Sequence, residues 1–307
     1  MKKAIITGAN GFIGRHLVRE YVNNGYFVFA IVKDEREDTS LLTTLQNVVI
    51  IYCELSEMKT LANKVEDREI DVFYHLAWAG VSGTGRNDYE LQLANIDYSC
   101  RAVEAASSMG CKRFVYVSTL IESENYRAIN KTVKPESITY YCAAKAAANA
   151  FCKTLANQYG LEYVKAVLAN TYSEKDTSDR FLYTSIRKML LREKVSFTNA
   201  EQMYDFIYLS DAVTGLFRIG ESGVINKSYF VGSLAPKPLK EYLFVVRDCI
   251  DRRIELGLGD LESSNVIIDY YEEYDIYAIK EDTGFVPKVS FEDGIERLIY
   301  EYKNNKL

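Results

Sequence analysis

The sequence predicts an α/β fold, a doubly wound parallel β-sheet with helices on both faces. Two observations carry this prediction. Strand-like apolar runs alternate with helical patterns through the first half of the 307-residue chain, which is typical of consecutive β-α-β units. The strand-like runs are almost continuously apolar, as expected for strands that are buried on both sides.

Six runs rich in β-branched and aromatic residues are expected to form the strands. They are Lys3–Thr7, Tyr26–Val32, Val48–Tyr52, Asp71–Leu76, Arg113–Val117 and Tyr163–Leu168. Helical spacing of apolar residues predicts helices between them. These helices are expected over Phe12–Val22, Tyr89–Met109 and Ser137–Tyr159.

The pattern becomes less regular after Leu168. Helices are expected over Arg180–Glu193 and Leu239–Ile250, and a strand over Asp205–Leu209. We interpret this half as a smaller, interleaved lobe. The prediction is a larger domain over residues 1–170 and a lobe over residues 171–307, with residues 204–213 returning to the larger domain.

Composition excludes several classes of function. The net charge of −6 leaves no global basic surface, so nucleic acid is not an expected partner. Only two histidines, His16 and His75, are present, which excludes a metal site built on several imidazoles; we predict no metal. The six cysteines form no C-x-x-C pair, and no signal peptide or membrane-length apolar run is seen. We therefore expect reduced thiols and a cytoplasmic protein without a membrane partner.

A glycine-rich turn separates the first expected strand from the first expected helix. It reads TGANGFIG over Thr7–Gly14. Glycines let the backbone turn tightly and approach a phosphate, and a helix N-terminus adds free N–H groups and a positive dipole end. The turn predicts dinucleotide binding, with an ordinary strand-to-helix turn as the alternative. The residues expected to contact the cofactor here are Gly8, Asn10, Gly11, Phe12, Ile13 and Gly14.

Charged residues follow the second expected strand, where the ribose of a dinucleotide is normally read. An acidic residue there binds the 2′-hydroxyl of NAD, and a basic residue accommodates the 2′-phosphate of NADP. Lys33 and Arg36 favour NADP, whereas Asp34 between them favours NAD. We predict NADP; a solvated charged loop is the remaining alternative.

A tyrosine and a lysine share one face of the expected mid-chain helix. Tyr141 and Lys145 are four residues apart, so both side chains can reach one site. Bringing a phenol from a pKa of about 10 to neutrality needs on the order of 4 kcal/mol. We expect Lys145 to supply much of this, and also to hydrogen-bond the cofactor ribose. With a hydroxyl from Ser118 or Thr119 at the end of the fifth strand, the set suits hydride transfer.

Several motifs occur in the order seen in one enzyme family. They are TGANGFIG at Thr7–Gly14, His75-Leu76-Ala77, Asn95, Val117-Ser118-Thr119, Tyr141 with Lys145, Asn170, the segment Tyr204–Asp211, and Gly284–Pro287 with Gly294-Ile295. Over nearly its whole length the chain resembles the extended short-chain dehydrogenase/reductases, specifically the nucleotide-sugar epimerase/dehydratase family. The resemblance implies a Rossmann-type dinucleotide-binding domain followed by a substrate-binding lobe.

The resemblance also implies roles for individual residues. Thr119, Tyr141 and Lys145 would be catalytic. Cofactor contacts are implied for Glu54, Leu55, Leu76, Ala77 and Ser118. Substrate contacts are implied for Asn170, Arg187 and Tyr204, together with Thr119. From the residues alone, Trp78 either lines the sugar site or packs beneath the cofactor, and His75 is expected to be structural.

Departures from the family pattern narrow the expected chemistry. The 4,6-dehydratases of the family carry Asp-Glu directly after the catalytic threonine, whereas Leu120 and Ile121 follow Thr119 here. Water elimination is therefore not expected. Tyr204 stands where the family has an arginine. The candidates for replacement charge lie on a neighbouring helix, with a solvated basic face as their alternative; they are Arg187, Lys188, Arg192 and Lys194.

The sequence therefore predicts an NADP-dependent reductase acting on the 4-keto group of a nucleotide-linked 4-keto-6-deoxyhexose. The alternative is a nucleotide-hexose 4-epimerase with tightly bound NAD, and a non-catalytic dinucleotide sensor is a third hypothesis. By the same resemblance we expect a homodimer, formed through the helices at Tyr89–Met109 and Ser137–Tyr159.

Overall fold

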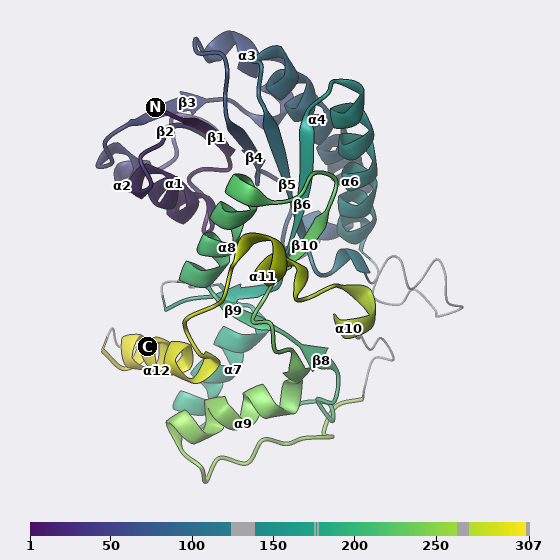
Figure 1. Ribbon diagram of the computed structural model, residues 1–307. Coiled ribbons are helices and arrows are strands. Elements are labelled where there is room, and N and C mark those ends of the chain that lie inside the picture. The colour runs from purple at the N-terminus through teal and green to yellow at the C-terminus, as the bar shows by residue number, and fades with distance from the viewer. Residues whose placement is uncertain (124–138, 175, 177, 263–269, 305–307) are drawn as a thin grey trace. The chain divides into compact units, whose positions relative to one another are not determined.

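The computed structural model describes residues 1–123, 139–174, 176, 178–262 and 270–304, and Figure 1 traces the chain. The chain divides into two compact units. The first comprises Met1–Leu168, Val213–Val231 and Tyr277–Phe285; the second comprises Ala169–Ala212, Gly232–Ile276 and Val286–Leu307.

A seven-stranded parallel sheet forms the centre of the first unit, in the order β10-β6-β5-β4-β1-β2-β3. This confirms the predicted α/β fold of Rossmann type. The sequence analysis missed only the edge strand β10. The strands are β1 (Lys3–Thr7), β2 (Phe27–Val32), β3 (Val48–Tyr52), β4 (Val72–His75), β5 (Arg113–Thr119), β6 (Glu162–Leu168) and β10 (Ser228–Val231).

Two long helices cover one face of this sheet side by side, α4 (Tyr89–Ser108) and α6 (Tyr140–Gln158). Phe73, Phe114 and Tyr163 of the sheet pack against them in one buried cluster. The helices contribute small residues to this cluster, which lets them approach the sheet and each other closely. These residues are Ala102, Ala105, Ala106, Ala148, Cys152 and Ala156. Ser137, the expected start of α6, lies outside the described residues.

The other face of the sheet is covered by α1 (Gly14–Asn23) and by the part of α8 (Leu209–Ser222) from Val213 onward. Side chains alternate along β4, so Tyr74 points away from Phe73. The Tyr21 hydroxyl donates to the Tyr74 hydroxyl over 3.2 Å, and the latter donates to the Leu216 carbonyl over 2.5 Å. A Cβ at Gly220 would lie 2.2 Å from both hydroxyls, so glycine is required there.

The second unit is built around aromatic residues. Tyr172, Phe206, Tyr242 and Phe291 pack with ring centroids 4.7 to 6.2 Å apart. Tyr172 and Phe206 come from one two-stranded sheet, and Tyr242 and Phe291 each come from a helix; a second two-stranded sheet and a further helix lie in the same unit. These elements are β7 (Asn170–Tyr172) with β9 (Phe206–Tyr208), β8 (Met203–Tyr204) with β11 (Lys237–Pro238), α7 (Phe181–Leu190), α9 (Leu239–Ile250) and α12 (Phe291–Asn304).

The division of the chain differs in detail from the expected one. The segments that return to the first unit are Val213–Val231 and Tyr277–Phe285, whereas we expected residues 204–213. The hydrogen bonds explain the difference: the buried Asp205 carboxylate accepts the Ser233 N–H, and Asp211 accepts the Lys288 and Val289 N–H groups, all within the second unit.

Shorter helices complete the described chain. They are α2 (Ser40–Thr43), η1 (Leu55–Thr60), α3 (Leu61–Lys64), η2 (Gly83–Asn87), α10 (Tyr270–Glu273) and α11 (Ala278–Thr283). All six cysteines are free thiols. Among the described residues, the helices are too short or too polar to cross a membrane.

Candidate functional site

The glycine turn after β1 is shaped by very close backbone contacts. Gly8 has a φ of +65°, a conformation that glycine adopts without a steric penalty. A Cβ at Gly14 would lie 2.1 Å from the Gly8 carbonyl oxygen, and one at Gly8 would lie 3.0 Å from the Ala77 nitrogen. The turn therefore needs glycine at both positions. Its helix, α1, begins at Gly14 without a side-chain cap or an acidic residue in its first turn.

Thr7 joins this turn to the end of β4. Its buried hydroxyl oxygen accepts the N–H groups of Leu76 and Ala77 over 3.1 and 3.2 Å. The same hydroxyl lies 3.1 Å from His75 Nδ1, while Nε2 of that ring lies 3.2 Å from the Ser99 hydroxyl. Burial lowers the pKa of His75 to about 3. His75 is therefore a neutral, hydrogen-bonded core residue.

A cavity of about 520 Å³ opens over the ends of β1, β2, β3 and β4. Gly8, Lys33, Glu54, Leu55 and Ala77, all expected at the cofactor site, are among the residues that line it. Carboxyl ends of parallel strands are where ligands of such sheets bind. The full lining is Thr7, Gly8, Ile31, Lys33, Cys53, Glu54, Leu55, Ser56, Met58, Ala77, Trp78, Ala79, Gly80, Leu91 and Tyr98.

The charged residues after β2 lie in two different surroundings. Lys33 lines the cavity, whereas the Arg36 guanidinium binds the Asp34 carboxylate through two nitrogens, at 2.7 and 3.0 Å. The guanidinium and the backbone N–H of Arg36 lower the pKa of Asp34 to about 2. Arg36 was expected to contact the cofactor; in the structure its charge is paired with Asp34.

Lys145 is buried beside the carboxyl end of β5. Its ammonium donates to the Val117 carbonyl over 3.1 Å and lies 3.9 Å from the centroid of the Trp78 ring. The Tyr116 hydroxyl donates to the Lys145 carbonyl over 3.1 Å. Burial lowers the pKa of Lys145 to about 7, because a buried ammonium loses its hydration.

Tyr141 stands one helical turn before Lys145 and is also buried. Its ring lies nearly perpendicular to the Trp78 ring, with centroids 6.1 Å apart, and the Arg86 guanidinium carbon lies 5.1 Å from its centroid. Burial raises the pKa of Tyr141 to about 12, opposed by the charge of Arg86 and by a hydrogen bond with Thr119. We expected Lys145 to be the cation acting on the phenol. The structure instead places Arg86 in that position and directs Lys145 toward Val117.

A buried ion pair lies behind the end of β5. The Ser118 hydroxyl donates to Glu122 Oε2 over 2.5 Å, and the other oxygen of Glu122 contacts the Lys165 ammonium. A carboxylate that is buried and fully paired in this way holds its partners in place, and breaking such a pair is costly. The pair fixes the backbone that carries Thr119. The sequence analysis did not identify it, because its members are 43 residues apart.

Two buried amides organise the loop after β4. The Asn95 side chain accepts the Ala79 N–H over 3.0 Å and donates to the Ala79 carbonyl over 2.9 Å. The Gln92 side chain accepts the Trp78 indole N–H over 2.9 Å and donates to the Gly85 carbonyl over 2.8 Å. Sequence analysis singled out Asn95 by resemblance and missed Gln92. Spacing could have found it, since Gln92 lies three residues before Asn95 on the same face of α4.

Comparison with known proteins identifies the family. The family model described as NAD dependent epimerase/dehydratase family matches residues 4–232. The chain belongs to this family. It is therefore an enzyme of the extended short-chain dehydrogenase/reductase type, as the sequence motifs predicted.

Individual relatives are distant. The chain is 24% identical to dTDP-glucose 4,6-dehydratase of Escherichia coli over 99% of its length and 94% of the relative's. It is 21% identical to CDP-abequose synthase of Salmonella muenchen, over 97% of both chains. Among solved structures it matches UDP-glucose 4-epimerase of Thermotoga maritima, with a TM-score of 0.76, 22% identity and 99% of both chains covered. It also matches WbmF of Bordetella bronchiseptica in complex with NADH, with a TM-score of 0.76, 18% identity, and 99% and 92% coverage.

The residues present fit the dinucleotide that the family name implies. The Gly8–Gly14 turn leaves no room for a Cβ at either glycine, as expected where backbone must approach a pyrophosphate. The cavity beside the turn runs past Lys33 and Glu54 toward Trp78. The remaining predicted cofactor residues of the turn, Asn10, Gly11, Phe12 and Ile13, lie between Gly8 and the start of α1 at Gly14.

Three residues predicted to contact substrate lie in the second unit. The Asn170 side chain donates to the Asp205 carbonyl over 3.0 Å. The Arg187 guanidinium pairs with Asp179 at 2.5 Å. The Tyr204 carbonyl accepts the Tyr242 hydroxyl over 3.3 Å. Their contacts with substrate stay predictions.

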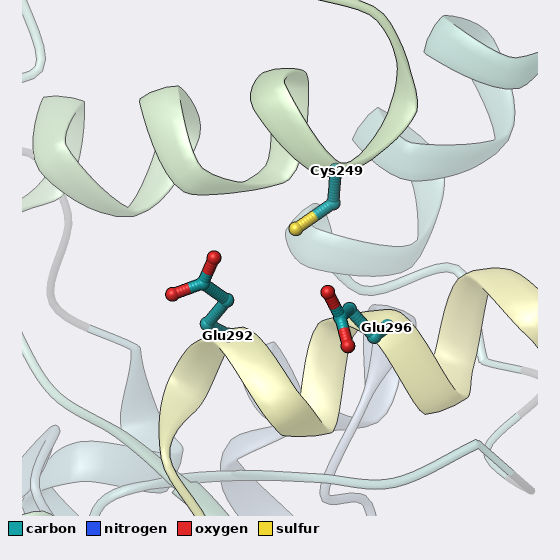
Figure 2. A group of neighbouring side chains, drawn as sticks. All are labelled: Cys249, Glu292 and Glu296. Carbon is teal, nitrogen blue, oxygen red and sulfur yellow. The ribbon is translucent and has the colours of Figure 1, made fainter.

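One group of possible metal ligands occurs among the described residues, also in the second unit. Figure 2 shows Cys249 of α9 facing Glu292 and Glu296 of α12, and their ligand atoms all lie within 4.8 Å of one another. Burial and the two carboxylates raise the pKa of Cys249 to about 11. Both glutamates are exposed, and exposed acidic groups commonly lie this close together without an ion. We assign no metal to this group.

The buried ammonium makes a testable prediction about stability. The folded protein holds Lys145 with a pKa of about 7, against 10.5 for the unfolded chain. Above pH 7 the unfolded state therefore binds one more proton than the folded state, so this group makes stability rise with pH, by up to about 1.4 kcal/mol per unit. The free energy of unfolding is measured with denaturant between pH 7 and 9, without added dinucleotide. It should rise less with pH for Lys145→Met than for the unmodified protein.

Lys153→Met provides the matched control, because Lys153 is a partly exposed lysine on the same helix. Its pH dependence should follow that of the unmodified protein. Parallel curves for Lys145→Met and the unmodified protein would show that Lys145 is not a destabilised ammonium.

Proposed function

We propose that this enzyme reduces the 4-keto group of a nucleotide-linked 4-keto-6-deoxyhexose, with NADPH as the hydride donor. The observation that supports this most is the set of Thr119, Tyr141 and Lys145 beside a dinucleotide-sized cavity, combined with apolar residues after Thr119. NADPH supplies a hydride to a carbonyl carbon when bound. The chain's own residues must then orient the carbonyl and supply a proton to its oxygen.

Each residue of the set has a separate task in this proposal. The Thr119 hydroxyl, which lowers the pKa of Tyr141, orients the carbonyl oxygen of the sugar. Tyr141 gives its phenolic proton to that oxygen, so that the carbonyl becomes a hydroxyl group, and recovers a proton from solvent. Lys145, buried at the base of the site, positions the cofactor ribose through its ammonium. General acid catalysis of this kind contributes about 10²–10⁴ in rate.

The residues after Thr119 argue against dehydration. Leu120 is buried and apolar, and Ile121 follows it. Neither can exchange a proton with a sugar carbon. The nearest carboxylate along the chain is Glu122, which is held by Ser118 and Lys165. The proposal therefore uses a single proton donor, Tyr141.

The charges after β2 support NADPH over NADH. Lys33 lines the cavity, and its ammonium can meet a 2′-phosphate there. Asp34, the residue that favours NAD, is engaged by the Arg36 guanidinium. The family name and the NADH complex of WbmF keep NAD as the alternative, and with it a 4-epimerase that retains its cofactor.

The nucleotide of the substrate is proposed to bind in the second unit. A cavity of about 370 Å³ there is lined by Phe181 and Phe197, with Lys188 at its side. Aromatic faces suit a nucleobase, and a lysine suits a phosphate. Asp179 also lines this cavity, and Arg187, which pairs with it, is the further cation expected beside the subsite.

The reductase proposal predicts stoichiometric consumption of NADPH. Incubation with a panel of dTDP-, CDP- and UDP-linked 4-keto-6-deoxyhexoses should oxidise one NADPH per 4-hydroxyl formed, measured by absorbance and mass spectrometry. Tyr141→Phe should lower kcat by about 10²–10⁴. Tyr159→Phe, which changes an exposed tyrosine at the end of the same helix, should leave kcat unchanged.

An epimerase would give a different result. The purified protein would release NAD on denaturation and would interconvert nucleotide-hexoses without net consumption of a reduced dinucleotide. That outcome would replace the reductase proposal. Full activity of Tyr141→Phe in either assay would contradict both functions.

Lys33 predicts a preference that can be measured without a substrate. Trp78 is the single tryptophan of the chain and lines the cavity, so dinucleotide binding should quench its fluorescence. Lys33→Ala should weaken NADPH binding by roughly tenfold, as for the loss of one charge-assisted contact, and leave NADH binding unchanged. Lys112→Ala, an exposed lysine before β5, is the control. An equal loss of affinity for NADPH and NADH in Lys33→Ala would contradict the proposed preference for NADPH.

We propose that the protein is a homodimer that pairs through α4 and α6. These neighbouring helices (Figure 1) expose Tyr89, Leu93, Tyr140 and Phe151, each more than half exposed. A groove of about 500 Å³ lies between them with an almost wholly apolar lining. Contiguous exposed apolar surface of this kind marks an interaction site.

Light scattering at micromolar concentration should therefore give the mass of a dimer. Leu93→Asp should shift the mass toward that of a monomer, because a carboxylate would be buried at the interface. Leu191→Asp changes an equally exposed leucine at the end of α7 and should leave the dimer intact. A monomeric mass for the unmodified protein would contradict the proposal.

A further inference from the structure

Arg86 lies beside Tyr141, the proposed proton donor, but belongs to none of the family motifs of the sequence. It stands in η2, between β4 and α4, and its guanidinium carbon lies 5.1 Å from the centroid of the Tyr141 ring. The Trp78 ring packs against the same ring nearly at a right angle. Arg86 and Trp78 thus both hold the phenol from the loop that follows β4.

One buried amide fixes both neighbours of the phenol. Gln92 accepts the indole N–H of Trp78 and donates to the carbonyl oxygens of Gly80 and Gly85, at 3.0 and 2.8 Å. Gly85 directly precedes Arg86. Gln92 therefore positions both the Trp78 indole and the backbone next to Arg86. A surface arginine without a role at the site would not need a fixed backbone.

The charge of Arg86 is not neutralised by a carboxylate among the described residues. Its Nε is buried and makes no hydrogen bond, and the ion pairs found in the described chain do not include it. An arginine that served only to link surface segments would be expected to pair with an acidic side chain or a carbonyl. Among the described residues, the Tyr141 ring is the group that the structure places against its guanidinium.

The other groups that face the phenol do not supply a positive charge. Thr119 of β5 and Cys142 of α6 are its other neighbours, and the positive charge of Arg86 lowers the pKa of Tyr141 against the effect of burial. Lys145, on the same helix, is directed to the Val117 carbonyl and the Trp78 ring.

We infer that Arg86 is a positioning residue of the proton-transfer site, whose guanidinium holds the Tyr141 ring against Trp78 and stabilises the phenolate that remains when the proton has been given up. This inference rests on the proposed function in one respect, that Tyr141 is the proton donor. No atom of Arg86 needs to contact the substrate. Its effect is therefore on the proton-transfer step and not on binding.

A titration of residue 141 tests the inference without a substrate. Difluorotyrosine, whose phenol ionises at lower pH than that of tyrosine, is placed at position 141 by codon suppression, and its ionisation is followed by ¹⁹F NMR. Arg86→Gln should raise the midpoint by roughly one pH unit, the effect of losing a nearby positive charge. Arg86→Lys, which keeps the charge, should titrate close to the unmodified protein. Arg86→Met serves as a second neutral variant if glutamine disturbs the turn.

An unchanged midpoint in both neutral variants would overturn the inference, as would equal shifts in Arg86→Lys and Arg86→Gln. In the NADPH assay, Arg86→Gln should lower kcat and increase the solvent deuterium isotope effect, with KM nearly unchanged. A raised KM with unchanged kcat would make Arg86 a substrate-binding residue instead. Loss of activity in Tyr141→Phe without any effect of Arg86 would leave the proposed function standing and this inference wrong.

Discussion

The burial of the Lys145 ammonium is the constraint on which the geometry of the site depends. A charged group in this position loses its hydration and must be satisfied by the protein. The Val117 carbonyl and the face of the Trp78 ring do this. Lys145 thereby ties α6 to the end of β5 and to the loop after β4, the three segments that carry Tyr141, Thr119 and Trp78.

A second constraint is the close approach of backbone around Gly8. Thr7 accepts hydrogen bonds from Leu76 and Ala77, and Gly8 and Gly14 leave no space for a Cβ. The strand ends β1 and β4 are thus locked together at one edge of the sheet. This contact shapes the cavity beside the two strand ends. The cavity is also lined by Trp78, whose ring contacts the Lys145 ammonium. Trp78 thus connects the proposed dinucleotide cavity to Tyr141, and all of these residues belong to the first unit.

Sequence patterns predicted the features that are set by residues close together in the chain. The alternating apolar runs located six strands of the sheet, and the glycine spacing located the turn. The i, i+4 spacing placed Tyr141 and Lys145 on one face of α6. Edge strand β10 was missed, because a run of four residues far along the chain has no periodicity that distinguishes it from a loop.

Contacts between distant side chains could not be predicted. Nothing in the spacing of Glu122 and Lys165 indicates that they pair, and a lysine inside a strand run gives no information about its partner. Arg86 lies in a glycine-rich loop whose path is set by Gln92, so its approach to Tyr141 appears only in three dimensions. The expectation that Lys145 acts on the phenol followed from helical spacing alone, and spacing does not determine where the end of a long side chain is held.

A crystal structure of the protein with bound NADP tests the central claim most directly. The account predicts the pyrophosphate against the Gly8–Gly14 turn and the nicotinamide end of the cofactor beside Tyr141, with the Lys145 ammonium on the ribose. A dinucleotide bound outside the cavity lined by Gly8 and Trp78, or one whose nicotinamide ring makes no contact near Tyr141 and Lys145, would contradict it.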